Sequence, residues 1–67
     1  MSVAKHIEIT VDSTKSFEDA VQKGIKTASK TVKGIRSGWI KDQQVLVKDD
    51  EVTTYRVNMK VTFVLKD

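Results

Sequence analysis

The chain of 67 residues contains no cysteine and no proline, and its three glycines are scattered along it. Without cysteine, disulfides and thiolate metal sites are excluded, and a single histidine, His6, leaves little for transition-metal binding. The scattered glycines cannot wrap a phosphate group. A chain this short buries only about 60% of the surface that it exposes when unfolded. Because disulfide and metal supports are missing, we expect oligomerisation to stabilise it.

Motifs of the common enzyme classes are also missing. The sequence has no nucleophile elbow, no H-E-x-x-H pair and no C-x-x-C pair. Adjacent carboxylates occur at Asp49, Asp50 and Glu51, in an expected turn. Exposure to water there gives no reason for one carboxyl to act as an acid while its neighbour acts as a base. We therefore expect a protein that is not an enzyme.

Long apolar runs and blocks of like charge are absent as well. No apolar segment reaches the length of a signal peptide or a membrane span, so we expect a cytoplasmic protein with no membrane partner. The formal net charge is +3, with acidic and basic residues mixed along the chain. Such mixing is typical of a solvated surface. Nucleic-acid binding through the lysine-rich helix is a weaker alternative, because the chain lacks the aromatic platform of strand-based binders.

The strongest pattern present is the alternation of residues 52–65. Polar side chains separate apolar or aromatic ones at every second position, namely Tyr55, Val57, Met59, Val61, Phe63 and Leu65. This alternation predicts a β-strand with one buried face and one wet face. Because strands usually have about 5–6 residues, the length predicts that this strand reaches beyond the sheet of its own subunit.

Two other segments are expected to be strands. Residues 4–11 alternate, with Ile7, Ile9 and Val11 on one face. Residues 35–48 carry apolar side chains at both odd and even positions, which favours a strand at a subunit interface or along a ligand pocket. The charge run at residues 48–51 is expected to form a hairpin turn into the long strand, with a Ca²⁺ site there as the alternative.

The segment between the first two strands has the signals of a helix. Ser16 and Asp19 approximate a capping box, so the helix is expected to start near Phe17. Apolar residues then recur at helical spacing as far as Val32, and Gly34 is expected to be the C′ residue. The order β-α-β-β predicts an α+β fold in a single domain, residues 1–67. In this fold one helix covers a three-stranded antiparallel sheet.

Trp39 is the most distinctive candidate for ligand binding. Its neighbours Ser37, Gly38 and Asp42 are small or polar. An indole beside hydrogen-bonding groups suits a planar aromatic ligand, which gains affinity from stacking and orientation from the polar groups. A core or interface role for this tryptophan is the alternative. On the polar face of the long strand, Arg56 is a further candidate.

Several stretches together resemble the dodecin family: the opening K-H-I-E-I-T-V-D-S-T-K-S-F-E-D-A-V, the helix end T-V-K-G-I and the closing T-Y-R-V-N-M-K-V-T-F-V-L. The resemblance covers nearly the whole chain. It implies a small flavoprotein that binds FMN, riboflavin or lumichrome, assembles as a hollow homododecamer and stores or sequesters the flavin. The alternative is a dodecin-like shell that instead holds calcium or phosphate-bearing ligands through Arg56, Asp42 and the acidic turn.

The resemblance also implies site residues. In flavin-binding dodecins a tryptophan early in the second strand stacks on the isoalloxazine ring, and a strand-two aspartate binds the ribityl chain. A glutamine after the strand-three tyrosine hydrogen-bonds the pyrimidine edge. Counting back from Tyr55 without gaps places the tryptophan position at Ser37, with Trp39 about 6–7 Å further along the same face. The glutamine position falls on Arg56, which donates but cannot accept, and the aspartate position falls on Asp42.

Overall fold

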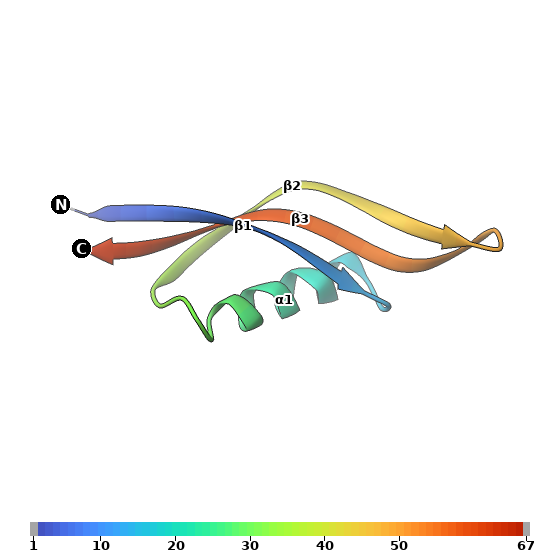
Figure 1. Cartoon of the computed structure of the whole chain (residues 1–67), viewed down its shortest axis with the longest axis horizontal. Helices are drawn as coiled ribbons and strands as arrows, with labels where there is room; N and C mark the ends of the chain where they lie inside the picture. The colour runs from blue at the N-terminus through green and yellow to red at the C-terminus, as the bar shows by residue number, and fades with distance from the viewer. Residues whose placement is uncertain (1, 67) are drawn as a thin grey trace.

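β3 (Glu51–Lys66) lies in the middle of a three-stranded antiparallel sheet with the order β1-β3-β2. A computed structural model describes residues 2–66 of the chain (Figure 1). β1 (Val3–Ser13) pairs with one edge of β3, and β2 (Ile35–Lys48) pairs with the other. α1 (Phe17–Ala28) lies against one face of the sheet (Figure 1). The predicted α+β fold of one helix on a three-stranded antiparallel sheet is confirmed.

β3 is paired along its whole length within its own chain. At its start Glu51 lies opposite Lys48 of β2, and at its end Lys66 lies opposite Val3 of β1. The two neighbours are staggered, so that between them they cover a strand longer than either. The prediction that this strand reaches beyond the sheet of its own subunit is therefore wrong.

We call the sheet surface that α1 covers the helix face and the opposite surface the open face. The alternation of β3 decides which side chains lie on the helix face, where Val57, Met59 and Val61 are at most 1% exposed. Partly buried apolar residues of β1, β2 and α1 surround them: Ile7, Ile9, Val11, Phe17, Val21, Ile25 and Ile35. Leu65, at the end of the alternating pattern, is 61% exposed, since this end of β3 extends beyond α1 (Figure 1).

The N-terminal end of α1 forms as predicted. The hydroxyl of Ser16 accepts a hydrogen bond from the backbone N–H of Asp19 at 2.9 Å, which satisfies one of the free donors at the helix start. Further along, a Cβ atom at Gly24 would lie 2.6 Å from Cγ2 of Val11. Gly24 therefore permits α1 to approach β1 closely.

The C-terminal end of α1 differs from the prediction. The helix ends at Ala28 rather than near Val32, so the longer helix is wrong. The hydroxyls of Ser29 and Thr31 donate to backbone carbonyls three residues earlier, at 2.6 and 3.3 Å. Local hydrogen bonds of this kind compete with continued helix. Gly34 is accordingly not the C′ residue. Its φ of +76° instead turns the chain into β2.

The hairpin between β2 and β3 closes through the predicted turn. Lys48 lies opposite Glu51, and the two residues between them, Asp49 and Asp50, have φ values of 53° and 64°. Positive φ at both central positions is the signature of a type I′ turn, which matches the twist of the flanking strands. Aspartate tolerates this left-handed conformation better than most residues.

β2 presents apolar residues at both odd and even positions because its register shifts. Three irregularities interrupt its pairing with β3, at Ile35/Ser37, Ile40/Asp42 and Leu46/Val47. An extra residue in a strand exchanges the positions that point to the two faces. In the single chain most of β2 is exposed, including Val45 at 39% and Val47 at 60%.

A single chain of this protein is long and thin. Its extents are 52 × 19 × 14 Å and its radius of gyration is 13.7 Å, against about 11 Å for a compact domain of this length. Large apolar side chains remain exposed at both ends and on β2. This shape supports the expectation that copies of the chain pack together. Within residues 2–66, no helix has the length and apolar character that a membrane crossing needs.

Candidate functional site

The four site residues predicted from the sequence share the open face of the sheet. In an antiparallel pair, residues directly opposite each other point to the same side. The even-numbered residues of β3 point away from α1, and each candidate on β2 lies opposite one of them: Ser37 opposite Thr62, Trp39 opposite Lys60 and Asp42 opposite Asn58. Arg56 is itself one of these even-numbered residues. The predicted common face of Ser37 and Trp39 therefore agrees with the register.

Trp39 stands out from the open face. Its side chain is 68% exposed, which excludes a core role within the chain. The ammonium nitrogen of Lys60 lies 5.6 Å from the centroid of the indole, over the ring. A cation in this position is attracted to the negative face of the aromatic ring. The tryptophan thus combines accessible aromatic surface with a neighbouring positive charge.

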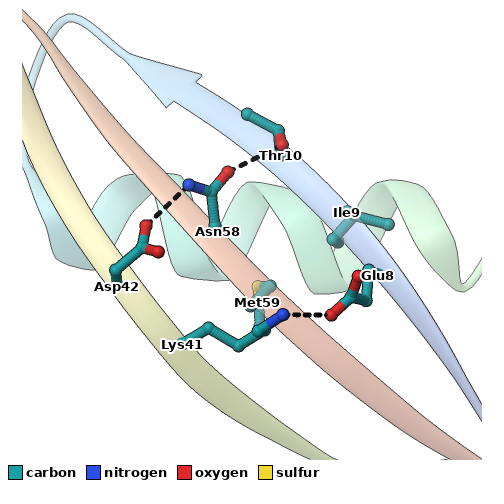
Figure 2. A pocket seen from close by; sticks show the side chains of 7 residues that line it. All are labelled: Glu8, Ile9, Thr10, Lys41, Asp42, Asn58 and Met59. Carbon is teal, nitrogen blue, oxygen red and sulfur yellow. Dashed lines mark hydrogen bonds and ion pairs between the residues drawn. The ribbon is translucent and has the colours of Figure 1, made fainter.

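Asp42 is held by a short chain of hydrogen bonds that crosses all three strands (Figure 2). The amide nitrogen of Asn58 donates to one carboxylate oxygen of Asp42 at 2.6 Å, and the hydroxyl of Thr10 donates to the amide oxygen of Asn58 at 2.7 Å. These contacts fix the orientation of the amide and of the carboxylate. An oriented carboxylate is a good acceptor for the hydroxyl groups of a ligand.

A hollow of about 210 Å³ adjoins this chain of hydrogen bonds (Figure 2). Its lining is mostly polar and comes from all three strands: Glu8, Ile9, Thr10, Lys41, Asp42, Asn58 and Met59. Across it, Lys41 forms an ion pair with Glu8. The hydrogen bond from Lys41 and its charge lower the pKa of Glu8, with a smaller effect from the charge of Lys60. The same pairing raises the pKa of Lys41.

Arg56 contacts an acidic residue of β1. Its Nε donates to Asp12 at 2.8 Å and its Nη2 donates to the other carboxylate oxygen at 3.0 Å. The hydrogen bonds and charge of Arg56 lower the pKa of Asp12, and those of Asp12 raise the pKa of Arg56. This two-point contact orients the guanidinium group within the open face.

The structure brings some of the predicted residues together and separates others. Trp39 lies opposite Lys60 and Asp42 lies opposite Asn58. These two β3 positions are two residues apart, or about 7 Å along the strand. Arg56 lies four β3 residues from the position opposite Trp39, or about 13 Å. Ser37 is on the same face as Trp39 but has no ring to stack on a ligand.

The residues of the predicted cation or phosphate site are spread along one chain. Asn58, opposite Asp42, is seven residues from Glu51 at the acidic turn, or about 24 Å along β3. Among residues 2–66, no three His, Asp or Glu side chains lie close enough together to hold one metal ion. A single chain therefore does not assemble the set of Arg56, Asp42 and the turn.

Sequence reasoning missed four side chains that shape this surface. Lys60 lies over Trp39, Asn58 orients Asp42, Asp12 orients Arg56, and Glu8 binds Lys41. All four occupy even positions on the wet faces of the two alternating strands. The alternation therefore marked them as exposed, but only the register shows which side chains across the sheet they contact.

Comparison with known proteins gives a consistent result. The family model Dodecin matches residues 3–66. A calcium-chelating calcium dodecin from Mycobacterium tuberculosis is 32% identical, with 92% of this chain and 89% of that chain covered and a TM-score of 0.82. A variant of the dodecin from Thermus thermophilus is 25% identical over 100% of both chains, with a TM-score of 0.92.

A dodecin from Streptomyces davaonensis has the same fold. It is 23% identical, with 98% of this chain and 97% of that chain covered and a TM-score of 0.92. No curated protein sequence matches the chain.

Proposed function

This chain belongs to the dodecin family, and on that premise we propose that it is the subunit of a homo-oligomer, a dodecamer, that binds and stores a flavin in the cytoplasm. The observation that carries the proposal is the exposure of Trp39, 68% accessible on a polar face about 7 Å from an oriented carboxylate. Stacking supplies affinity and polar groups supply orientation for a planar ligand. FMN, riboflavin and lumichrome all have the required ring. The protein binds this ligand without catalysing a reaction on it.

The residues of the open face fit parts of a flavin. Trp39 offers the indole for stacking, so the tryptophan takes the role that Ser37 cannot fill. Asp42 accepts hydrogen bonds from the hydroxyl groups of the ribityl chain. A bound flavin supplies a light-absorbing redox ring, and the protein limits the exposure of that ring. Arg56, about 13 Å from Trp39 along the sheet, reaches the edge of the same ring only from a neighbouring subunit.

The shape of the single chain supports assembly. A single chain is 14 Å thick in its thinnest direction and exposes apolar side chains on β2 and at the ends of the sheet. It gains stability when other copies cover these surfaces. Assembly also encloses the open face, on which the four predicted ligand-binding residues lie. Binding sites of this protein therefore form where copies meet.

Flavin titration tests the proposal. Trp39 is the single tryptophan of the chain, so protein emission reports on this residue while flavin emission reports on the ligand. We expect FMN, riboflavin or lumichrome to quench both signals, Trp39→Ala to abolish flavin quenching, and Trp39→Phe to retain part of it. Absence of flavin quenching at micromolar protein and ligand would reject flavin binding.

A second candidate function is calcium binding. The relative from Mycobacterium tuberculosis at 32% identity is described as calcium chelating. In this chain, Asp49 and Asp50 present exposed carboxylates at the hairpin turn, and Asp42 presents another on the open face. Copies that meet at these positions would supply the several oxygen ligands that Ca²⁺ requires. Phosphate-bearing ligands form the other part of this alternative, through Arg56.

Thermal unfolding distinguishes the second candidate from the first. Calcium binding predicts a higher unfolding midpoint in calcium than in EDTA. If the turn holds the ion, a variant with both Asp49→Asn and Asp50→Asn should have the same unfolding midpoint in the two solutions. Asp42→Asn tests the open face in the same way. Inorganic phosphate is tested with Arg56→Gln as the variant. An unfolding midpoint that neither calcium nor phosphate changes rejects this candidate.

A further inference from the structure

We infer that Lys60 determines the charge specificity of the Trp39 site, giving it a preference for planar aromatic ligands that carry a negative charge over neutral ligands with the same ring. This inference rests on the proposed function, because it concerns the selectivity of the same site. FMN and riboflavin form the decisive pair of ligands, since they share one ring system and differ by a phosphate group.

The position of Lys60 is set by the sheet. It lies on β3, between Trp39 on β2 and Glu8 on β1, and the register places it directly opposite both residues. Its ammonium nitrogen lies 5.6 Å from the indole centroid. The ring of a ligand stacked on Trp39 therefore lies close to the positive charge of Lys60. The flexible stem of a lysine lets this charge follow a phosphate group rather than remain at one point.

The ion pair between Glu8 and Lys41 leaves the positive charge of Lys60 beside Trp39. Glu8 forms an ion pair with Lys41, so the acid neutralises one of the two lysine charges. Glu8, Lys41 and Lys60 together carry a net charge of about +1 at neutral pH, and Asp42, about 7 Å further along the sheet, adds a negative charge beyond them. Lys41 lowers the pKa of Glu8, which keeps this carboxylate ionised well below neutral pH.

Three other charged groups of the open face, Arg56, Asp12 and Asp42, do not supply this preference. Arg56 and Asp12 neutralise each other through their two hydrogen bonds. Asp42, about 7 Å along the sheet from the Trp39 position, is acidic and suits hydroxyl groups rather than an anion. Lys60 is consequently the group to which we assign selection of a negative ligand.

A single positive charge near the phosphate group of a ligand has a measurable effect on affinity. The charge that distinguishes FMN from riboflavin is on the phosphate group, so the preference requires the flexible side chain of Lys60 to approach that group. At a separation of about 6 Å, in surroundings between protein surface and water, one positive charge changes affinity by roughly three- to tenfold. Salt weakens such an interaction when both charges are exposed. We therefore expect FMN to bind roughly three- to tenfold more tightly than riboflavin at low salt, with the ratio approaching one as salt is raised.

Flavin fluorescence titrations of the assembled protein with FMN and with riboflavin test this assignment. Lys60→Gln should bring the two dissociation constants together, and Lys60→Arg should keep the preference. Glu8→Gln should strengthen it, because the variant removes the acid that neutralises one lysine. Lys30→Gln is the matched control, since it changes the net charge equally at an exposed position beyond the end of α1 and should leave the ratio unchanged.

The outcomes separate the two proposals. Equal affinity for FMN and riboflavin in the wild-type protein, or an unchanged ratio in Lys60→Gln, overturns the role of Lys60 while flavin binding stands. An equal loss of preference in Lys30→Gln also overturns it, because the effect then belongs to net charge. Binding of neither flavin overturns the proposed function itself. Circular dichroism and mass in solution confirm that each variant folds and assembles.

Discussion

Arg56 on β3 and Asp12 on β1 are held together by two hydrogen bonds, from Nε at 2.8 Å and from Nη2 at 3.0 Å. The two residues are 44 positions apart in the sequence, so the contact exists only when β1 pairs with β3. Hydrogen bonds and charge from Arg56 lower the pKa of Asp12. The stability of the fold is therefore linked to pH at this contact.

Acid should weaken the fold through Asp12. Because its pKa is lower in the folded chain than in the unfolded chain, the contact contributes its full stabilisation above about pH 4. This stabilisation is lost as the pH falls through the folded-state value. The change should be small, since both side chains are partly exposed. Thermal unfolding between pH 7 and acid conditions measures it.

A double-mutant cycle isolates the contact between Asp12 and Arg56. Asp12→Asn and Arg56→Gln should each lower the unfolding midpoint at pH 7, and the double variant should lose little more than either single variant. The variants should also lose less stability on acidification than the wild-type protein. Fully additive effects of the two substitutions would contradict a direct interaction.

Asp42→Asn should weaken binding of riboflavin by about tenfold, because it removes the charge from an acceptor of ribityl hydroxyl groups. Lumichrome has the ring but no ribityl chain, so its affinity should change little. Asn58→Ala should also weaken riboflavin binding more than lumichrome binding. The loss should be smaller than for Asp42→Asn, since Asn58 only orients the carboxylate. Equal losses for both ligands in fluorescence titrations would instead assign Asp42 to the ring or to the fold.

Gly24→Ala should destabilise the protein although alanine favours helix. The substitution gains about 1 kcal/mol of helix propensity but places a methyl group 2.6 Å from Cγ2 of Val11 and 3.3 Å from Cδ1 of Ile9. Overpacking of this kind costs about 1–3 kcal/mol. Gln22→Ala, at an exposed position of α1, is the control and should be neutral or slightly stabilising. A rise in the denaturation midpoint of Gly24→Ala would show that α1 can move away from β1.

Assembly should be detectable in dilute solution. We expect a particle of about twelve chains of 7.5 kDa by light scattering or sedimentation, with an unfolding midpoint that rises with protein concentration. Val47→Asp places a charge on a side chain that is 60% exposed in one chain. It should be harmless to a monomer but should reduce assembly if copies cover this surface. A stable monomer that unfolds independently of concentration would contradict the proposal.

Local patterns determined the elements of the fold. The alternation of β3, the cap at Ser16 and the acidic hairpin turn each depend on residues that are neighbours in the chain, and all three agree with the structure. The end of α1 was missed because hydroxyl-to-carbonyl hydrogen bonds compete closely with helix there. The spacing of apolar residues and the capping residues gave only a weak signal for where α1 ends.

The sequence by itself determined that this chain forms a thin β-α-β-β layer with one wet strand face, because period 2 separates buried from exposed side chains wherever a strand occurs. Only the tertiary structure decided the strand order, the register shifts of β2 and the contacts of Trp39 with Lys60 and of Arg56 with Asp12. Such contacts join residues far apart in the chain. A shift of one residue would turn every side chain of a strand to the other face, so their chemistry is set by register, which no local pattern records.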